Sequence, residues 1–310
     1  MKIVFLDAYS IGNADVSALA ALGEFVSYQT TAPEQVLARC SDAGIVITNK
    51  VRLMQPELEA LTNLKLICIA ATGMNNVDLK VAAEKGIVVR NVTDYSTDSV
   101  AELTFTMVLG LIHQTSYFDE YVKSGAYSRS GLFTHQEQSF FEIKGKRWGI
   151  IGMGHIGHRV AEIASAFGAK ISYYSTSGKN TEAGYPQKDL NALMTESDIL
   201  SIHAPLNERT QYLIDYKMLC LMKPEAYLIN VGRGGIVKET DLAKALRENR
   251  LAGAGLDVFE QEPLSSVNPL LSLDIQDKLL MTPHIAWASA EACQRLIDTM
   301  VKQIKTYLGI

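Results

Sequence analysis

The sequence has few cysteines, and none of their spacings defines a metal site or a disulfide framework. Cys40, Cys68, Cys220 and Cys293 are scattered over 310 residues. A structural zinc site needs closely paired ligands, and a disulfide scaffold needs a much higher density of cysteine. We therefore expect no metal, a reducing compartment such as the cytoplasm, and cysteines that are buried as small hydrophobic residues.

Clusters of positive charge and long apolar segments are also missing. The formal net charge is −5, whereas binding to nucleic-acid phosphates needs clustered Lys and Arg. The N-terminal MKIVFLDAYS reaches Asp7 too early for the apolar core of a signal peptide. The longest apolar segment, residues 103–112, is about half of the ~20 residues that span a bilayer. We expect a soluble, mildly acidic protein with neither nucleic acid nor membrane as a partner.

Short apolar runs that alternate with helical segments make up most of the chain. The first series is KIVFLDA, FVSYQ, GIVITN, LKLICIAA and GIVVRNV, and the second is RWGIIG, ISYYS, ILSIHA, YLINVG, GAGLDV and KLLMTPH. This alternation predicts an α/β protein with parallel, doubly wound sheets. The second series has the six-strand pattern of a dinucleotide-binding domain, and the chain is long enough for two domains.

The two series are joined by a helical run and an irregular segment. Residues 98–112 predict a long helix that crosses between domains, and residues 113–146 are polar, rich in aromatic side chains and weakly periodic. The irregular segment fits an arm on a partner subunit or an ordinary surface excursion. Near the C-terminus, Leu296, Met300 and Ile304 have the spacing of an amphipathic helix. Because the second sheet is already complete, we expect that helix to return to the first domain.

A glycine-rich turn lies between a predicted strand and a predicted helix in RWGIIGMGHIGHRVAEIASAFG. Gly152 allows a tight turn, Gly154 lets the backbone approach a pyrophosphate, and Gly157 permits close packing of the helix. The helix N-terminus favours negative charge. A lone GxGxxG can be an ordinary turn, but the flanking strand and helix favour dinucleotide binding here.

The position that usually carries an acid for the adenine ribose holds Ser175. In NAD-selective domains an Asp or Glu there accepts hydrogen bonds from the ribose 2′-hydroxyl and repels a 2′-phosphate. The stretch ISYYSTSGKN instead offers Ser175, Thr176, Ser177 and Lys179. It could hold a phosphate, or it could be a solvated turn that does not discriminate, which the absence of Arg favours. We expect dual or weakly discriminating use of NAD and NADP.

Three segments each place one functional side chain after a strand-like run. These are Arg233 in YLINVGRGGIV, Glu262 in LDVFEQEP and His284 in LLMTPHIAW. Taken singly, each fits an ion-pair residue, a solvated acid or a structural histidine. Because ligands bind at the carboxyl ends of parallel strands, we expect the three to converge on one site.

With these segments the sequence resembles the D-isomer-specific 2-hydroxyacid dehydrogenases of the formate and glycerate dehydrogenase superfamily, on the side of glycerate dehydrogenase and hydroxypyruvate reductase. The likeness runs from ATGMNNVD (71–78) and SVAE through GIIGMGHIG, NVGRGG and LDVFEQEP to TPHIAWAS. It implies a flavodoxin-like substrate domain of residues 1–97 plus 285–310. It also implies an inserted Rossmann NAD(P)-binding domain of residues 98–284 and a homodimer.

The resemblance assigns catalytic roles to Arg233, Glu262 and His284. Arg233 would bind the substrate carboxylate and polarise the carbonyl, which suits its planar fork of donors. Glu262 would stabilise the protonated ring of His284, which gives its proton to the carbonyl oxygen as hydride arrives. The implied reaction is NAD(P)H-dependent reduction of a small 2-keto acid, such as hydroxypyruvate or glyoxylate, to the D-2-hydroxy acid. The alternatives are a D-lactate-type dehydrogenase and a non-enzymatic, corepressor-like protein that senses NAD(H).

Further contacts follow from the same resemblance. Substrate contacts are expected at Lys50, Val51, Ala71, Thr72, Gly73 and Trp287, with Arg52 at the pocket mouth. Cofactor contacts are expected at Gly152, Gly154, His155, Ile156, Gly157, Ser175, Thr176, Lys179, His203, Ala204, Pro205, Val231 and Asp257. Asp257 would hold the nicotinamide carboxamide. His155 and His158 lack the acidic or Cys companions of a metal site.

Overall fold

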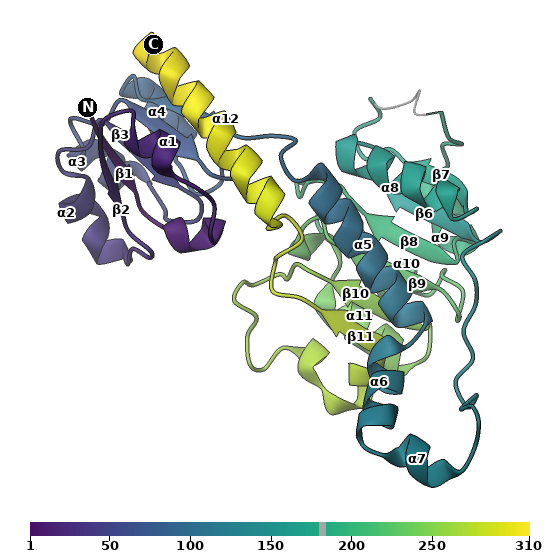
Figure 1. Cartoon of the computed structure of the whole chain (residues 1–310). Helices are drawn as coiled ribbons and strands as arrows, with labels where there is room; N and C mark the ends of the chain where they lie inside the picture. Colours follow the sequence, from purple (N-terminus) through teal and green to yellow (C-terminus); the bar gives the residue numbers. More distant parts are fainter. Residues whose placement is uncertain (180–183) are drawn as a thin grey trace. The chain divides into compact units, whose positions relative to one another are not determined.

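The computed structural model describes residues 1–179 and 184–310 and divides into two compact units (Figure 1). Unit 1 comprises Met1–Ser96 and Trp287–Ile310, and unit 2 comprises Thr97–Ala286. Each unit contains one sheet in which every strand pair is parallel. The predicted fold class, two doubly wound parallel-sheet α/β domains, is confirmed.

Unit 1 is built on a five-stranded sheet with the flavodoxin-like order β2-β1-β3-β4-β5. Its strands are β1 (Lys2–Phe5), β2 (Glu24–Ser27), β3 (Ile45–Thr48), β4 (Leu66–Ile69) and β5 (Val88–Asn91). Its helices are α1 (Ser17–Ala20), α2 (Val36–Cys40), α3 (Gln55–Ala60), α4 (Leu79–Glu84) and α12 (Ala290–Leu308), with 3₁₀ turns η1 (Ala8–Ile11) and η2 (Pro33–Gln35). Every residue of β3 and β4 is buried, as expected for parallel strands covered on both faces.

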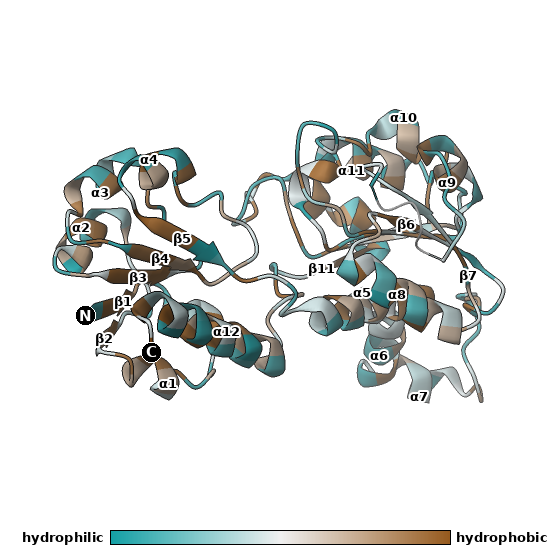
Figure 2. Cartoon of the chain, turned by 90° about the horizontal axis from the view of Figure 1, so that it is seen from above, coloured by the Kyte–Doolittle hydropathy of each residue, from teal (hydrophilic) through white to brown (hydrophobic). Residues whose placement is uncertain are grey.

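Helices cover both faces of the sheet of unit 1, with α1 and α12 on one face and α2, α3 and α4 on the other (Figure 2). The apolar stripe of α12, Leu296, Met300 and Ile304, is buried in one core cluster with Phe5 of the sheet. The hydroxyl of Ser289 caps the start of α12 by accepting the N–H of Ala292. The C-terminal segment therefore completes the core of unit 1.

Unit 2 is built on a six-stranded sheet with the order β11-β10-β9-β8-β6-β7. Its strands are β6 (Arg147–Ile151), β7 (Lys170–Tyr174), β8 (Ile199–Ile202), β9 (Tyr227–Asn230), β10 (Gly253–Leu256) and β11 (Leu279–Met281). An isolated parallel bridge joins Tyr173 of β7 to Gln187. If Gln187 is counted as the remnant of a third strand, the sheet has the Rossmann order 3-2-1-4-5-6, extended by β11.

Helices also cover both faces of the sheet of unit 2 (Figure 2). On one face lie α5 (Thr97–Ile112) and α8 (His155–Ala166), and on the other α9 (Leu190–Glu196), α10 (Tyr216–Leu219) and α11 (Glu239–Arg247). Phe105 of α5 packs on Trp148 of β6 with ring centroids 4.9 Å apart. Short 3₁₀ turns complete the unit, namely η3 (Gly234–Ile236), η4 (Pro269–Leu271) and η5 (Leu273–Lys278).

The irregular segment after α5 contains two helices, α6 (Thr115–Lys123) and α7 (Ala126–Ser130). Its aromatic side chains pack on one another, with Tyr121 stacked on His135 at a centroid distance of 4.0 Å. Phe133 is 94% exposed. The sequence pattern did not predict these helices because aromatic contacts within the segment, rather than an apolar stripe facing the sheet, hold them.

Three of the four cysteines, Cys40, Cys68 and Cys293, are buried, whereas Cys220 is exposed. The expectation that all four are buried is therefore wrong for Cys220, which lies at the C-cap of α10. Burial raises the pKa of Cys40 to about 11 and that of Cys68 to about 12. In the two described stretches of the chain, no helix combines the length and the apolar character needed to cross a bilayer.

Candidate active site

The carboxyl ends of the six parallel strands of unit 2 share one edge of its sheet, where ligands bind in such folds. Most of the sequence-predicted site residues of this unit follow those strands, in the order Gly152 and Gly154 after β6, Ser175 and Thr176 after β7, His203, Ala204 and Pro205 after β8, Val231 and Arg233 after β9, Asp257 and Glu262 after β10, and His284 after β11. The architecture thus gathers them at a single edge.

The glycine loop between β6 and α8 has the backbone geometry that its glycines predict. Gly152 has a φ of +92°, and a Cβ on it would lie 2.9 Å from the backbone of His203 and Ala204. A Cβ on Gly157 would lie 2.2 Å from the carbonyl oxygen of Gly152. Around Gly154, the N-cap of α8, a Cβ would meet no described atom within 4 Å. Open space at the start of this helix fits a dinucleotide pyrophosphate.

The turn after β7 carries no carboxylate from Ser175 to Lys179. Ser175 is buried, and its Oγ accepts the N–H of Gly178 at 3.1 Å. Lys179 is exposed and donates its N–H to Ser177. Asn180, the last residue of the stretch ISYYSTSGKN, lies outside the described residues. The hydroxyl that replaces the usual acid therefore shapes the turn.

A buried hydrogen-bond chain ends at His203. The indole Nε1–H of Trp148 donates to Ser201 Oγ at 2.9 Å, and Ser201 Oγ lies 3.0 Å from His203 Nε2. If the serine hydroxyl donates to Nε2, the second ring nitrogen, Nδ1, carries the proton, and Nδ1 is buried without a partner among the described residues. Burial lowers the pKa of His203 to about 3. A neutral ring with one unused polar atom fits a ligand group beside the glycine loop.

Asp257 holds the segment that carries His284. Its buried carboxylate accepts hydrogen bonds from Thr282 Oγ1 at 2.6 Å and from the N–H groups of Ile285 and Ala286, both at 2.8 Å. Burial raises the pKa of Asp257, and these hydrogen bonds oppose the increase. His284 has a φ of +55°, which is rare for a residue with a side chain, and its N–H bonds the carbonyls of Asp257 and Thr282. The nicotinamide contact of Asp257 stays a prediction.

Arg233, Glu262 and His284 line one hollow of about 320 Å³ in unit 2, together with Tyr212 and Phe259. Glu262 Oε2 lies 2.7 Å from His284 Nδ1. Arg233 is exposed, and its Nη1 donates to the carbonyl of Gly232 at 2.7 Å. A carboxylate that orients an imidazole beside a guanidinium can bind a carboxylate-bearing ligand and exchange a proton with it.

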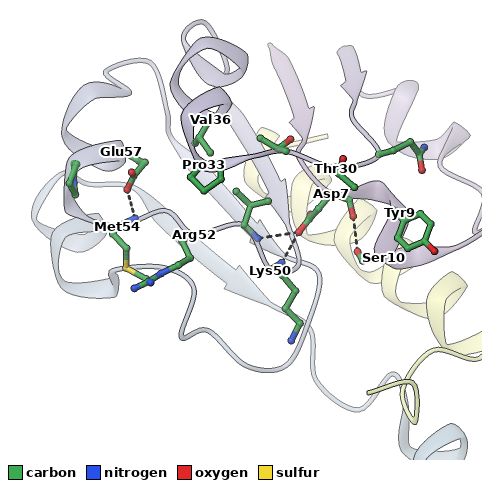
Figure 3. Close-up of a pocket in the computed structure, with 14 residues that line it drawn as sticks. Asp7, Tyr9, Ser10, Thr30, Pro33, Val36, Lys50, Arg52, Met54 and Glu57 are labelled. Carbon is green, nitrogen blue, oxygen red and sulfur yellow. Dashed lines mark hydrogen bonds between the residues drawn. The ribbon is translucent and has the colours of Figure 1, made fainter. Parts of the chain in front are cut away.

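In unit 1, Asp7 shapes the loop where substrate contacts are expected. Its buried carboxylate accepts the N–H groups of Asn49 at 2.9 Å, Lys50 at 2.6 Å and Val51 at 3.2 Å. This loop borders a hollow of about 630 Å³ beyond the ends of β1, β2 and β3, and Lys50 and Arg52 lie along it (Figure 3). No sequence motif assigned Asp7 a role, although an acid directly after a first strand is a usable signal.

The other expected substrate residues also belong to unit 1. Ala71, Thr72 and Gly73 follow β4, and Thr72 Oγ1 donates to the carbonyl of Val92 at 2.9 Å, which ties this loop to the end of β5. Trp287 packs edge to face on Tyr95, with ring centroids 6.3 Å apart. All of these residues belong to unit 1. Their roles toward substrate stay predictions.

Metal-ligating side chains do not gather in the described residues, where no three of His, Cys, Asp or Glu are arranged to hold an ion. His155 is exposed at the first position of α8, Ile156 follows it, and His158 is half-buried one turn along.

Known proteins resemble this chain over nearly its whole length. The hydroxypyruvate reductase of Blautia hydrogenotrophica is 34% identical over 99% of this chain and 97% of the relative. The glycerate dehydrogenase of Methylorubrum extorquens is 35% identical over 99% of this chain and 96% of the relative. A solved NADPH-dependent glyoxylate/hydroxypyruvate reductase from Sinorhizobium meliloti, in complex with NADP and malonate, superposes with a TM-score of 0.82 at 28% identity, covering 99% of this chain and 93% of that one.

The family comparison agrees with these relatives. Residues 105–286 match the NAD binding domain of D-isomer specific 2-hydroxyacid dehydrogenases. This match covers more than half of the chain and contains the glycine loop, Arg233, Glu262 and His284. The resemblance drawn from the sequence motifs is thereby confirmed. The chain belongs to the D-isomer specific 2-hydroxyacid dehydrogenase family and is an NAD(P)-dependent oxidoreductase.

Proposed function

We propose that this enzyme reduces hydroxypyruvate or glyoxylate to D-glycerate or glycolate. The observation that carries the proposal is the 2.7 Å pair of Glu262 and His284, which shares a hollow with Arg233. The relatives from Blautia hydrogenotrophica and Sinorhizobium meliloti are named for hydroxypyruvate and for glyoxylate and hydroxypyruvate.

Each of the three side chains has a separate task in the proposed reaction. Arg233 binds the substrate carboxylate and polarises the keto oxygen. Glu262 accepts a hydrogen bond from Nδ1–H of His284, which orients the ring and stabilises its protonated form. His284 then gives a proton from Nε2 to the keto oxygen, and it takes that proton back in the oxidation. The bound nicotinamide cofactor supplies the hydride.

The residues of unit 2 that would hold the cofactor are those at the strand ends. Gly152, Gly154 and Gly157 shape the pyrophosphate site, with His155 and Ile156 at the helix start. The remaining contacts proposed are Ser175, Thr176, Lys179, His203, Ala204, Pro205, Val231 and Asp257. We expect both NADH and NADPH to serve, because Ser175 does not repel a 2′-phosphate. Within unit 1 we propose that Ala71, Thr72 and Gly73 supply backbone amides to the substrate carboxylate and that Lys50, Val51 and Trp287 line the substrate pocket.

Steady-state kinetics with hydroxypyruvate, glyoxylate and pyruvate, each with NADH and with NADPH, test the proposal. We expect consumption of reduced nicotinamide with the first two acids, measured by its absorbance. A higher kcat/KM with pyruvate would make the enzyme a D-lactate-type dehydrogenase. Binding of NADH by fluorescence titration without turnover of any 2-keto acid would favour the cofactor-sensing alternative.

We also propose that the enzyme is a cytoplasmic homodimer. The segment after α5 exposes Leu132 (63%), Phe133 (94%) and Phe140 (57%), an apolar surface that suits a subunit contact. Four free cysteines suit a reducing compartment. Light scattering coupled to gel filtration tests the dimer, and replacement of Phe133 by Ser should shift it toward the monomer.

A further inference from the structure

The buried Glu239 and the exposed Glu260 exchange hydrogen bonds beside the turn that carries Glu262. The backbone N–H of Glu239, the first residue of α11, donates to Glu260 Oε1 at 2.7 Å. In return the backbone N–H of Glu260 donates to Glu239 Oε1 at 2.5 Å. This reciprocal pair, which we call the glutamate clasp, joins the start of α11 to the turn after β10.

The second oxygen of each carboxylate has a donor of its own. Glu239 Oε2 accepts Asn268 Nδ2–H at 2.5 Å, and Glu260 Oε2 accepts the hydroxyl of Tyr212 at 3.1 Å. Glu239 is only 5% exposed, and the hydrogen bonds to its two oxygens offset part of the cost of burying its carboxyl group. Neither of these bonds runs to an amide within α11, so the side chain does not act as a cap for its own helix.

The turn held by the clasp presents Glu262 to His284. The N–H of Phe259, one residue before Glu260, donates to Glu262 Oε1 at 3.0 Å, and Glu262 Oε2 reaches His284 Nδ1 at 2.7 Å. The carbonyl of Phe259 in turn lies against Gly234, beside Arg233. A shift of this one turn would therefore move Glu262 relative to both of its neighbours in the hollow.

We propose that Glu239 is a positioning residue for the reaction, which fixes the Phe259–Glu262 turn so that Glu262 orients His284. The proposal rests on the proposed roles of Glu262 and His284. Glu239 acts through the backbone of Glu260, whose N–H it accepts. Misplacement of a catalytic group by about 1 Å can lower turnover by about 100-fold. We therefore expect loss of the clasp to lower kcat.

The charge state of Glu239 gives the proposal a pH signature. The titratable groups that face it are Glu260 and Glu262 from the turn and Tyr212 from the segment before α10. Burial raises the pKa of Glu239, the hydrogen bonds from Glu260 and Asn268 oppose this, and the two carboxylates add to it. Protonation would place a hydrogen on one of the two oxygens that now accept hydrogen bonds, so the side chain could no longer keep both the bond from Glu260 and the bond from Asn268.

Glu239→Gln imitates the protonated state, because an amide offers one acceptor oxygen where the carboxylate has two. We expect kcat to fall about 10- to 100-fold while the KM for NADH stays within about twofold. The ratio of wild-type to variant kcat should shrink toward one as the pH falls through the raised pKa of Glu239. Glu225→Gln, at an exposed turn before β9, is the matched control and should retain wild-type kinetics.

Hydrogen exchange of the full-length chain gives a readout that needs no turnover. In Glu239→Gln the peptide that contains residues 257–262 should exchange faster, while peptides of unit 1 keep their wild-type rates. If Glu239→Gln does not fold, Glu260→Ala, at the exposed half of the clasp, should show the same loss of kcat and the same local exchange. Wild-type kcat in the folded variants, or unchanged exchange at residues 257–262, would overturn the proposal. Absence of turnover in the wild type would instead count against the proposed function, and the exchange data would still decide whether the clasp holds the turn.

Discussion

The α-carbon of Gly234 lies against the carbonyl of Phe259, so closely that a Cβ at residue 234 would stand 1.9 Å from that oxygen. This contact joins the loop after β9, which carries Arg233, to the turn after β10, which carries Glu262. The relative position of the guanidinium and the carboxylate therefore depends on the absence of a side chain at residue 234. Gly234 has no positive φ that would call for glycine, so close approach is the reason for it.

Gly234→Ala should separate these two loops and lower kcat/KM for hydroxypyruvate by at least about tenfold. Gly235→Ala is the matched control, because its Cβ would make an ordinary 3.5 Å contact with Leu206. Steady-state kinetics of the two variants measure the difference. Equal activity in both would show that the contact does not position the two side chains.

His284→Ala should lower kcat by about 100- to 10,000-fold, because it removes the proposed proton donor. Binding of NADH, followed by fluorescence titration, should change little. Glu262→Gln keeps a hydrogen-bond partner for Nδ1 but removes the charge, so its kcat should lie between those of His284→Ala and the wild type. Near-normal turnover in His284→Ala would refute the assignment.

Gly154→Ala and Gly157→Ala should affect different properties. A Cβ at residue 157 would lie 2.2 Å from the carbonyl oxygen of Gly152, so this variant should lose roughly 1–3 kcal/mol of unfolding free energy. A Cβ at residue 154 meets open space and should leave stability unchanged while raising the KM for NADH about tenfold, because the pyrophosphate needs that space. Thermal unfolding and cofactor titration of both variants separate the two effects.

Ser175→Asp should lower kcat/KM for NADPH by about 100-fold, because a carboxylate would face the 2′-phosphate. Its effect on NADH should stay within a few fold, since an aspartate can also accept the N–H of Gly178 and keep the turn. Ser41→Asp places the same charge at an exposed site in unit 1 and serves as the control. A wild-type preference of 100-fold or more for NADH would show that another element selects the cofactor.

His203 should make folding sensitive to acid. Its pKa is about 3 in the folded chain against 6.5 for the unperturbed side chain, so between these values only the unfolded state binds the proton. The contribution to stability is therefore complete above pH 6.5 and is lost as the pH falls toward 3. Urea unfolding should show a loss of at most about 1.4 kcal/mol per pH unit from this group, and His203→Gln should flatten the dependence between pH 6.5 and 4.5. Parallel pH profiles for the variant and the wild type would contradict this.

The two sheets could be predicted because their central strands, such as β3, β4 and β8, are covered on both faces and appear as continuous apolar runs. The glycine loop and the segments of Arg233, Glu262 and His284 could be found because they follow such runs. The bridge at Gln187 could not be found, since a strand reduced to one residue has no periodicity. The roles of the site residues stay predictions until the variants are measured.

The contacts that shape the site were beyond the sequence analysis for a different reason. Asp7 bonds the amide of a residue 42 positions away, and Glu239 bonds one that is 21 positions away. Each of these hydrogen bonds depends on where two loops meet once the sheet has formed. Neither an apolar pattern nor a sequence motif indicates such a contact. The exposure of Cys220 was not predicted, because the sequence around a cysteine does not show whether other parts of the chain pack over the end of its helix.

The three amides that Asp7 holds have a consequence for protein engineering. Residues 49–51 take their shape from a side chain encoded more than forty positions upstream, so a loop transplanted from a relative would arrive without its support. A chimera that exchanges this loop must carry the donor's residue 7 as well. Altered specificity in chimeras that lack this partner would reflect a collapsed loop rather than the transplanted side chains.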